Sequence, residues 1–359
     1  MGKTPPIRLG LIGCGSIAAS AHLPAIARLP QLVRLVATAD VNLQAATQAA
    51  ADAGAQAYTD YRQVVERPDI DMVLLATPEY LHREQVEAAA ANGKHVLCEK
   101  PMAPSLADAD RMISACASSG VRLMVAHSRR FTRRYQAVRE AIDRGEIGQV
   151  IMVRENERRS RPLPGEEGYY WRTGHWTSDP AVSVGAVLTN GIHETDLLRW
   201  FAGAEPVSVF AEHSTTIEGN QVPDFITLTV RFANGALGSA EVSNCWPAGY
   251  PSYHQLELYG TGGMIRSRDS DQQGLIRFRP GAADFPDSYH RLLHVQDAYT
   301  TELGLFARAL RDDLPVPLPA SEARAALRLG LAAVASAKSG MPITLATSPS
   351  EQDQGGAAQ

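Results

Sequence analysis

A glycine-rich turn near the start of the chain constrains its fold more than any other feature. An apolar run, Ile7 to Ile12, ends in Gly13-Cys14-Gly15-Ser16-Ile17-Ala18, which matches the pattern Gly-x-Gly-x-x-Gly/Ala between a strand and a helix. Gly13 permits a tight turn, and Gly15 lets a pyrophosphate approach the backbone. The helix that follows offers free N–H groups and a positive dipole end to the phosphates. The motif predicts a dinucleotide site, and a plain tight turn is the open alternative.

Asp40 strengthens the prediction of a dinucleotide site. It follows a second apolar run, Leu32 to Ala39. A carboxylate at the end of the second strand can accept hydrogen bonds from both ribose hydroxyls. A 2′-phosphate there would bring like charges to about 4 Å, which costs up to roughly 4 kcal/mol near a protein surface. No Arg or Lys follows immediately in Val41-Asn42-Leu43 to offset this cost. The sequence therefore favours NAD over NADP.

The first third of the chain alternates short apolar runs with Ala-rich helical stretches, which is typical of a parallel sheet covered on both faces. The next predicted strands are Met72 to Ala76, His95 to Cys98 and Leu123 to Ala126, and the helices include Asn42 to Ala53 and Glu84 to Ala91. With right-handed crossovers these elements form a doubly wound parallel sheet, the Rossmann fold.

After about Phe131 the pattern changes. A helical stretch (Arg134 to Arg144) precedes strand-like runs at Gln149 to Glu157, Val207 to His213, Phe225 to Phe232, Ala236 to Ser243, Gln255 to Tyr259 and Leu275 to Phe278. Asn234-Gly235 lies between two of these runs and predicts a tight hairpin. Short connections favour a largely antiparallel open β-sheet. A helix is expected from near Ile192, and two late helices from Thr301 to Arg311 and from Ser321 to Ser339.

Length and pattern together predict the domain organisation. A chain of 359 residues exceeds the usual size of one core. We predict an NAD-binding Rossmann domain over residues 1–127, an α+β domain for substrate binding and oligomerisation over residues 128–345, and a disordered polar tail over residues 346–359.

Composition excludes several classes of protein. A net charge of −5 gives no electrostatic footprint for nucleic acid or for an anionic membrane. No apolar run reaches the roughly 20 residues that cross a bilayer, and the first residues lack the apolar core of a signal peptide. Four scattered cysteines, Cys14, Cys98, Cys116 and Cys245, lack metal-type spacing. We expect reduced thiols, no metal site and a cytoplasmic location.

Two polar motifs follow predicted strands of the first sheet. Ala76-Thr77-Pro78 with His82 follows one strand, and Glu99-Lys100-Pro101 follows the next. The carboxyl ends of parallel strands are where ligands bind in doubly wound folds. Lys100 would then place a cation near the nicotinamide end of the cofactor. A solvated loop lysine is the open alternative.

Together these residues resemble the glucose-fructose oxidoreductase / inositol dehydrogenase / rhizopine-catabolism (Gfo/Idh/MocA) family from Ile7 to about Leu345. Further residues carry the resemblance beyond the motifs already described: Arg129-Arg130-Phe131, Gly191-Ile192-His193 with Asp196-Leu197-Leu198, Tyr259-Gly260-Thr261, Ser336, Gly340 and Pro342. The order Glu-Lys-Pro followed by Gly-x-His-x-x-Asp is specific to this family and is poorly explained by chance.

The resemblance implies roles for several side chains. It implies that Lys100 contacts substrate and cofactor and that His193 donates or accepts the proton. Oxidation of a secondary alcohol would send the hydroxyl proton to His193 and the hydride to nicotinamide, while Lys100 stabilises alkoxide character. Asp196, one helical turn later, would orient the His193 ring or bind substrate. A helix-start histidine satisfied by backbone is the open alternative for His193.

The chain departs from the family pattern at one position. Many members carry Asp four residues before the histidine, where this chain has Thr189 followed by Asn190. Threonine cannot act as a carboxylate base, so the Lys-Asp-His trio is incomplete. We expect Asn190 to hydrogen-bond substrate, since the Asn form occurs in part of the family.

Other basic and aromatic residues extend the predicted site. Trp171-Arg172 matches a family segment whose Arg approaches cofactor or substrate, and Arg130 opens the crossover between the domains. A surface pair is the alternative for Trp171 and Arg172. The run Arg154, Arg158, Arg159, Arg161 is expected to be a solvated face; if it lined the cleft, it would favour an anionic substrate such as a uronate or a sugar nucleotide.

The predicted site can be stated by role. The catalytic residues are Lys100 and His193. The remaining cofactor contacts are Gly13, Gly15, Ser16, Ile17, Asp40, Thr77, Pro78, His82, Glu99 and Arg172. The substrate contacts are Lys100, Arg130, Trp171, Asn190, His193 and Asp196.

The resemblance favours an NAD-dependent dehydrogenase or reductase for a sugar, inositol or related hydroxylated compound. Two alternatives stay open: redox-neutral use of NAD in glycoside cleavage or epimerisation, and a non-catalytic NAD-binding regulator. The resemblance also implies a homodimer or homotetramer assembled through the antiparallel sheet. The sequence does not identify the sugar or polyol, the reaction direction or the stereochemistry.

Overall fold

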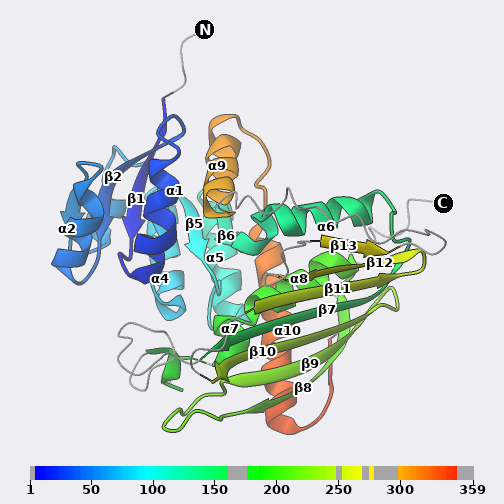
Figure 1. Ribbon diagram of the computed structural model, residues 1–359. Helices are drawn as coiled ribbons and strands as arrows, with labels where there is room; N and C mark the ends of the chain where they lie inside the picture. Colours follow the sequence, from blue (N-terminus) through cyan, green and yellow to red (C-terminus); the bar gives the residue numbers. More distant parts are fainter. Residues whose placement is uncertain are drawn as a thin grey trace. The chain divides into compact units, whose positions relative to one another are not determined.

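The computed structural model describes residues 5–160, 176–180, 182–183, 185–247, 253–268, 275–278 and 298–345. Contacts between residues divide the chain into two compact units (Figure 1). The first unit contains residues 1–135 and 295–327, and the second contains residues 136–294 and 328–359. Each unit is built on its own β-sheet.

The first unit contains a six-stranded parallel sheet in the order β3-β2-β1-β4-β5-β6. Its strands are β1 (Ile7–Ile12), β2 (Val33–Ala39), β3 (Gln56–Tyr58), β4 (Met72–Leu75), β5 (His95–Glu99) and β6 (Leu123–Ala126). The strand order reverses between β1 and β4, so the carboxyl ends of these two strands mark the switch point where doubly wound folds bind ligands.

Helices connect these strands, and one helix from late in the chain joins them. The helical segments are η1 (Ala18–His22), α1 (Leu23–Ala27), α2 (Leu43–Ala51), α3 (Arg62–Val65), α4 (Glu79–Ala91), α5 (Leu106–Ser118), η2 (Ser128–Phe131) and α9 (Ala298–Arg311). Phe306 of α9 is fully buried in the same core as Leu9 and Leu11 of β1. Residues 295–327 therefore complete the core of the first unit.

The second unit contains an eight-stranded sheet in the order β13-β12-β11-β7-β10-β9-β8-β14. Its strands are β7 (Val150–Ser160), β8 (Pro206–Ser214), β9 (Phe225–Phe232), β10 (Leu237–Trp246), β11 (Tyr253–Gly260), β12 (Gly263–Arg268), β13 (Leu275–Phe278) and β14 (Ile343–Thr344). All neighbouring pairs are antiparallel except β10 with β7, which is parallel. The predicted hairpin is present: Gly235 has φ +87° in the turn between β9 and β10.

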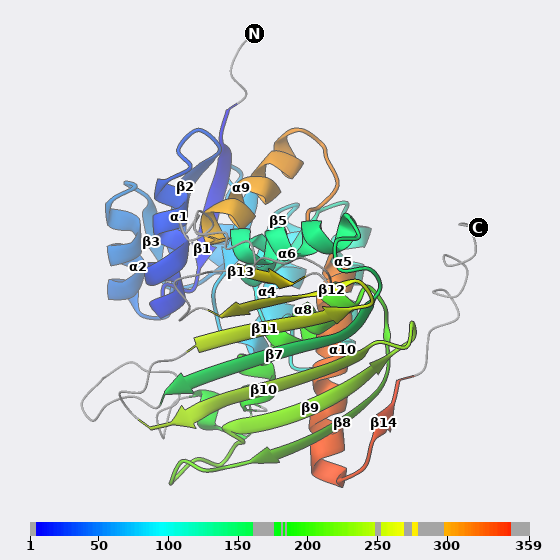
Figure 2. The ribbon, with the colours of Figure 1, turned by 45° about the vertical axis from the view of Figure 1, so that its right-hand side comes forward.

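Helices cover one face of this sheet (Figures 1 and 2). The remaining helical segments are α6 (Arg133–Asp143), η3 (Trp176–Ser178), α7 (Ala186–Thr189), α8 (Ile192–Ala202) and α10 (Ala320–Ser339). Helix α8 lies on β7 and β10, and ten of its eleven residues are buried. Close packing explains Gly238 of β10, because a Cβ there would lie 2.9 Å from Phe232.

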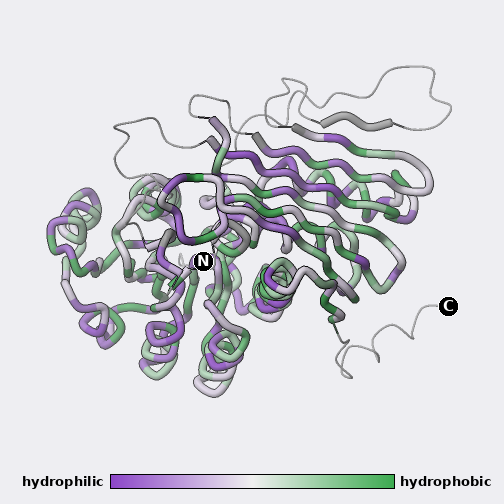
Figure 3. The backbone as a smooth tube through the Cα atoms, turned by 90° about the horizontal axis from the view of Figure 1, so that it is seen from below, coloured by the Kyte–Doolittle hydropathy of each residue, from purple (hydrophilic) through white to green (hydrophobic). Residues whose placement is uncertain are grey.

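The other face of the sheet carries no helix among the described residues, as Figure 2 shows. Along the strands of this sheet, hydrophobic and hydrophilic residues alternate (Figure 3). Buried Val230 and Leu228 of β9 alternate with exposed Thr229 and Arg231. The alternation fixes which face packs on the helices, because a slip of one residue would expose the apolar set.

The predicted fold class is confirmed, and the structure adds three features. The three-residue strand β3 and the two-residue strand β14 are too short to show a pattern in sequence. Parallel pairing of β7 with β10 was not expected. The third is that residues 295–327 group with the first unit, so a single division at residue 128 does not describe the contacts. The predicted tail, residues 346–359, lies outside the described residues.

Candidate functional site

The glycine-rich turn joins β1 to the first helix at the switch point of the parallel sheet. Gly13 has φ +87°, and a Cβ there would lie 2.6 Å from the carbonyl carbon and oxygen of Ala76. Gly13 is therefore required both by its backbone conformation and by close approach. Gly15 and Ser16 are exposed, and a Cβ built on Gly15 meets no atom within 4 Å. Gly15 thus leaves open space above the backbone.

Asp40 lies at the end of β2, and backbone donors fix its carboxylate. Cys14 N–H donates to Oδ2 at 2.8 Å, and Asn42 N–H donates to Oδ1 at 2.8 Å. Each oxygen keeps a second lone pair for another donor. Burial, together with the charge of Asp40, raises the pKa of the Cys14 thiol to about 12, burial having the larger effect. A fixed carboxylate beside the glycine-rich turn suits two ribose hydroxyls and repels a 2′-phosphate.

These features fit an NAD-type dinucleotide. Open space at Gly15 would admit the pyrophosphate, and the helix start at exposed Ser16 and half-buried Ile17 would face it. Asp40 would hold the adenosine ribose. The first unit thus has three geometric features that a dinucleotide site needs: the positive φ of Gly13, the space at Gly15 and the hydrogen-bonded carboxylate of Asp40.

His82 of α4 ties together two loops at the carboxyl edge of the sheet. Its Nε2 lies 2.8 Å from the Thr77 carbonyl oxygen, and its Nδ1 lies 3.1 Å from that of Pro101. The ring is fully buried, and burial lowers the pKa of His82, although the carbonyl contacts act in the opposite direction. Sequence reasoning predicted a direct contact between His82 and the cofactor. The structure shows the ring buried against the carbonyls of Thr77 and Pro101, and its contact with the cofactor stays a prediction.

Glu99 is likewise buried behind Lys100. Its Oε1 lies 2.8 Å from His22 Nε2, and its Oε2 accepts from Lys100 N–H at 3.0 Å. Burial alone raises the pKa of Glu99, but the His22 contact and the charges of His22 and Lys100 outweigh it and lower the pKa. Glu99 is 5% exposed, and its bond to Lys100 N–H holds the start of the loop that carries Lys100; its contact with the cofactor stays a prediction. The Lys100 side chain itself is half-buried.

Two further buried acids near this site were missed by sequence reasoning. Glu302 of α9 is fully buried, and neither carboxylate oxygen has a hydrogen-bond partner among the described residues. Burial and the Glu99 charge raise its pKa well above the ordinary value, burial having the larger effect. Glu79 of α4 is 4% exposed, and burial raises its pKa to about 7. No motif marks either acid, since their burial depends on packing between distant segments.

In the second unit, Thr189 ends α7, Asn190 lies in the turn that follows, and His193 lies in the first turn of α8. All three are buried, at 8%, 6% and 6% exposed. His193 N–H donates to the Asn190 carbonyl at 3.1 Å, and Thr189 Oγ1 donates to the Gly185 carbonyl at 3.0 Å. Thr189 is thus bonded back to its own helix. Asn190 Nδ2 donates to Asn244 Oδ1 of β10 at 2.7 Å.

The other predicted substrate contacts fall into three groups. Asp196 lies one turn after His193 in α8 and is 1% exposed. Arg130 belongs to the first unit, is 7% exposed, and its Nη2 donates to Glu322 at 3.2 Å. Trp171 and Arg172 lie outside the described residues. Lys100 and His193, the predicted catalytic residues, belong to different units.

The basic run on β7 is paired with acids. Arg158 donates to Glu241 at 2.7 and 2.9 Å and lies over the Trp246 ring. Arg154 lies 3.7 Å from Glu257. Arg159 is bonded to the fully buried Glu157, and Arg161 lies outside the described residues.

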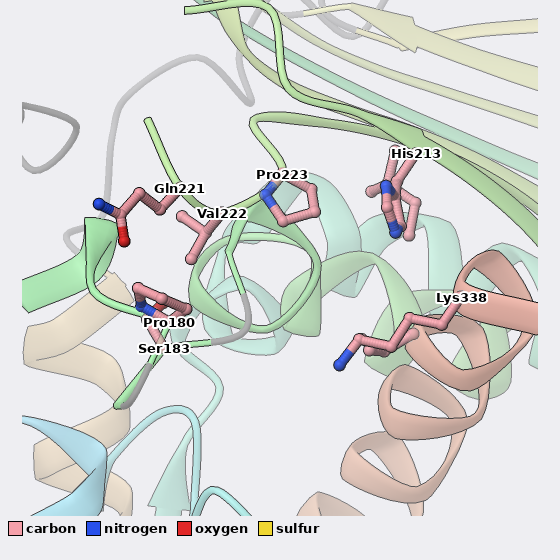
Figure 4. Close-up of a pocket in the computed structure, with 9 residues that line it drawn as sticks. Pro180, Ser183, His213, Gln221, Val222, Pro223 and Lys338 are labelled. Carbon is pink, nitrogen blue, oxygen red and sulfur yellow. The ribbon is translucent and has the colours of Figure 1, made fainter. Parts of the chain in front are cut away.

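One cavity of about 140 Å³ lies in the second unit (Figure 4). Its described lining includes His213 of β8, Gln221 and Pro223 of the following loop, and Lys338 of α10. No predicted site residue is among the lining residues that the structure describes. His213 therefore serves as a control residue in the experiments below.

Two kinds of feature are absent from the described ranges. No helix there is long and apolar enough to span a membrane. No group of three or more His, Cys, Asp or Glu side chains there is arranged to hold a metal ion.

The chain is similar to known proteins over both units. Residues 7–127 match the family model described as an oxidoreductase family with an NAD-binding Rossmann fold, and residues 135–266 match the model of the GFO/IDH/MocA C-terminal domain. Myo-inositol 2-dehydrogenase of Thermotoga maritima is 31% identical over 334 residues, which cover 91% of this chain and 95% of the relative.

Two solved structures have the same fold. The WlbA dehydrogenase from Bordetella pertussis, in complex with NADH and UDP-GlcNAcA, has a TM-score of 0.83 and 28% identity, covering 97% of this chain and 100% of that chain. Levoglucosan dehydrogenase in complex with NADH has a TM-score of 0.83 and 26% identity, covering 96% and 100%. The similarity therefore extends well beyond the glycine-rich turn.

Proposed function

Because the chain belongs to the Gfo/Idh/MocA oxidoreductase family, whose Rossmann domain binds NAD, we propose that it transfers a hydride between NAD and a secondary alcohol or ketone of a sugar, an inositol or a related compound. The observation that carries the choice of NAD is the Asp40 carboxylate, held by Cys14 N–H at the end of β2. Relatives named for myo-inositol and levoglucosan support the substrate class.

Each site residue then has a chemical role. Bound NAD supplies the hydride acceptor. His193 accepts the hydroxyl proton during oxidation, and the ammonium group of Lys100 stabilises the developing negative charge on the same oxygen. Asn190 binds a further hydroxyl, and Asp196 supports His193 from within α8. The buried contacts of His82 and Glu99 hold the loops that carry Thr77, Pro78 and Lys100. Arg130, Trp171 and Arg172 stay predicted contacts.

The proposal is tested by mixing NAD with a panel of inositols, aldoses and anhydrosugars and following the absorbance of reduced nicotinamide. We expect His193→Ala to lower kcat/KM by roughly 10²–10⁴-fold because the general base is lost. The Kd for NAD should stay unchanged. His213→Ala, which removes a histidine from the cavity in Figure 4, is the matched control and should retain wild-type turnover.

Three outcomes would contradict the proposal. Equal turnover by wild type and His193→Ala would remove His193 from the reaction. Conversion of substrate without accumulation of reduced cofactor would favour the redox-neutral alternative. NAD binding with no conversion of any panel member would favour a regulator.

We also propose that a second copy covers the open face of the eight-stranded sheet, giving a homodimer or homotetramer. Leu237 of β10 is 41% exposed on this face, since its neighbour Gly238 faces Leu198 of α8 on the other side of the sheet. The rest of this face carries charged pairs such as Arg158 with Glu241, which is typical of a polar interface rim. The four cysteines all lie within the described residues and form no disulfide, which supports a reducing compartment, for which we propose the cytoplasm.

A further inference from the structure

A buried pair of carboxamides links β10 to the turn that carries His193. Asn190 Nδ2 donates to Asn244 Oδ1 at 2.7 Å. Asn190 is 6% exposed and Asn244 is 0% exposed. Because both side chains are buried, this bond competes little with bonds to bulk water. Asn244 therefore fixes the orientation of the Asn190 carboxamide.

Asn244 is itself anchored by the loop between β8 and β9. Its N–H donates to the Asp224 carbonyl at 2.9 Å. The Asp224 carboxylate is fully buried and accepts from the N–H groups of Thr216 and Ile217 and from the Thr216 hydroxyl, at 2.7–3.0 Å. These bonds hold the backbone of Asn244 in place. The carboxamide pair thus rests on a rigid support.

The pair also lies next to the predicted proton acceptor. The Asn190 carbonyl accepts from His193 N–H at 3.1 Å, so both residues belong to the turn that opens α8. Residues three apart face the same side of such a turn. The Thr189 hydroxyl donates to the Gly185 carbonyl, so its hydrogen is already used within the chain. Asn190 therefore lies beside His193 as a second candidate for contact with substrate.

One hydrogen-bond donor of the carboxamide pair has no acceptor among the described residues. Asn244 Nδ2 is buried and has no hydrogen-bond partner in the part of the chain that the structure describes. A buried donor without a partner lowers stability unless a ligand or water satisfies it. Because Asn190 donates through Nδ2, its Oδ1 is oriented as an acceptor. The pair therefore offers one acceptor and one donor from adjacent positions.

We propose that Asn244 is a positioning residue for the substrate, acting through Asn190. It sets the Asn190 oxygen to accept from one substrate hydroxyl, and its own Nδ2 donates to a neighbouring hydroxyl. A donor next to an acceptor matches two adjacent hydroxyls, so the site selects vicinal diols of a polyol. This inference rests on the proposed function. It assigns to Asn190 and Asn244 the place of the carboxylate that Thr189 lacks.

The test is a double-mutant cycle on kcat/KM for myo-inositol, or for whichever panel member wild type oxidises. We expect Asn190→Ala and Asn244→Ala each to lower kcat/KM about 10–100-fold, mainly through KM. The kcat/KM of the double variant should be no more than about threefold below that of the less active single variant, because the effects of two residues in one hydrogen-bonded unit are coupled. The Kd for NAD should not change.

Two further variants separate positioning from folding. Ser239→Ala removes a hydroxyl from the half-exposed face of the same strand and should behave as wild type. Asn244→Asp keeps an oxygen to accept from Asn190 and should recover part of the loss seen in Asn244→Ala. Wild type should lose activity on the monodeoxy analogue that lacks the neighbouring hydroxyl, and Asn244→Ala should no longer distinguish it from the full polyol.

The outcomes distinguish this inference from the proposed function. Independent losses that multiply in the double variant, or wild-type kcat/KM in Asn244→Ala, would overturn the role of Asn244. If His193→Ala were still inactive in that case, the proposed function would stand. No turnover of any polyol by wild type would overturn both.

Discussion

At the scale of single residues, we propose that Asp40 sets the choice of cofactor. Its two oxygens accept from Cys14 N–H and Asn42 N–H, so the carboxylate cannot turn away from an incoming phosphate. A 2′-phosphate about 4 Å from this charge would be opposed by up to roughly 4 kcal/mol. The preference for NAD therefore comes from repulsion as well as from bonds to the ribose.

We predict that Asp40→Asn reduces the ratio of the Kd for NADP to the Kd for NAD at least about tenfold. The amide keeps the size of the side chain and one acceptor oxygen but removes the charge. Isothermal titration of both nucleotides measures the ratio. Asp52→Asn, at the exposed end of α2, is the control and should leave it unchanged. An unaltered ratio in Asp40→Asn would contradict the role given to this carboxylate.

Glu79 gives the pH dependence of stability a defined sign. Burial raises its pKa from 4.5 to about 7, while its own backbone N–H and the Lys100 charge lower it by less. Between these values the folded protein binds a proton that the unfolded chain releases. The contribution of Glu79 to the free energy of unfolding is fully present below pH 4.5 and is lost as the pH rises through 7. The total change is about 3 kcal/mol.

We predict that Glu79→Gln removes this dependence. The free energy of unfolding of wild type relative to Glu79→Gln should fall by about 3 kcal/mol between pH 4.5 and about 8. Urea unfolding at several pH values measures the difference. Glu84→Gln, on the exposed side of the same helix, should show no such trend. A constant difference between wild type and Glu79→Gln would show that Glu79 titrates normally.

Single residues also show where sequence reasoning ends. Gly13 and Asp40 were predictable because their roles follow from local spacing. His82 is marked by its motif, but its contact with the carbonyls of Thr77 and Pro101 depends on two loops meeting. Asn244 carries no motif, because its partner Asn190 is brought to it only when β10 packs on α8.

At the scale of elements, the turn after β1 combines two glycines with different requirements. Gly13 has a positive φ and no room for a Cβ beside Ala76. Gly15 has room for a Cβ, and its requirement arises only when a pyrophosphate approaches.

We predict opposite effects for alanine at these positions. Gly13→Ala should destabilise the protein by roughly 1–3 kcal/mol, from left-handed strain and from overlap with Ala76. Gly15→Ala should unfold like wild type but weaken NAD binding about tenfold or more, because the methyl group occupies the space of the phosphates. Thermal unfolding and NAD titration of both variants test the pair. Equal stability of the two variants would contradict the geometry assigned to the turn.

Elements with a strong period were predictable from sequence, and short or rearranged ones were not. The alternation of β9 and the Asn234-Gly235 turn predicted the hairpin correctly. The parallel pairing of β7 with β10 could not be inferred, because nothing in either strand specifies a partner so far along the chain.

At the scale of the whole molecule, the chain returns to its first unit before it ends. Residues 295–327 complete the first core through α9, and α10 begins in the first unit and ends in the second. A fragment that ends at residue 127 would lack Phe306, which is fully buried in the first core. Periodicity predicted α9 but could not show which core it joins.

We predict that the assembly depends on the open face of the second sheet. Replacing Leu237 with Asp should convert the oligomer to monomers, because a charge would be buried without a partner. Light scattering measures the mass. Val41→Asp, at an exposed residue of the first unit, is the control and should leave the mass unchanged. An oligomer that persists in Leu237→Asp would place the interface elsewhere.

The central claim is that a dinucleotide on the first sheet and an imidazole of the second unit act on one carbon. A crystal structure with NADH and a polyol that the enzyme oxidises tests it most directly. The account predicts that Lys100 and His193 both contact the hydroxyl on the carbon facing nicotinamide C4, with Asp40 bonded to the adenosine ribose. A dinucleotide away from Gly15, or a polyol that His193 does not contact, would contradict it.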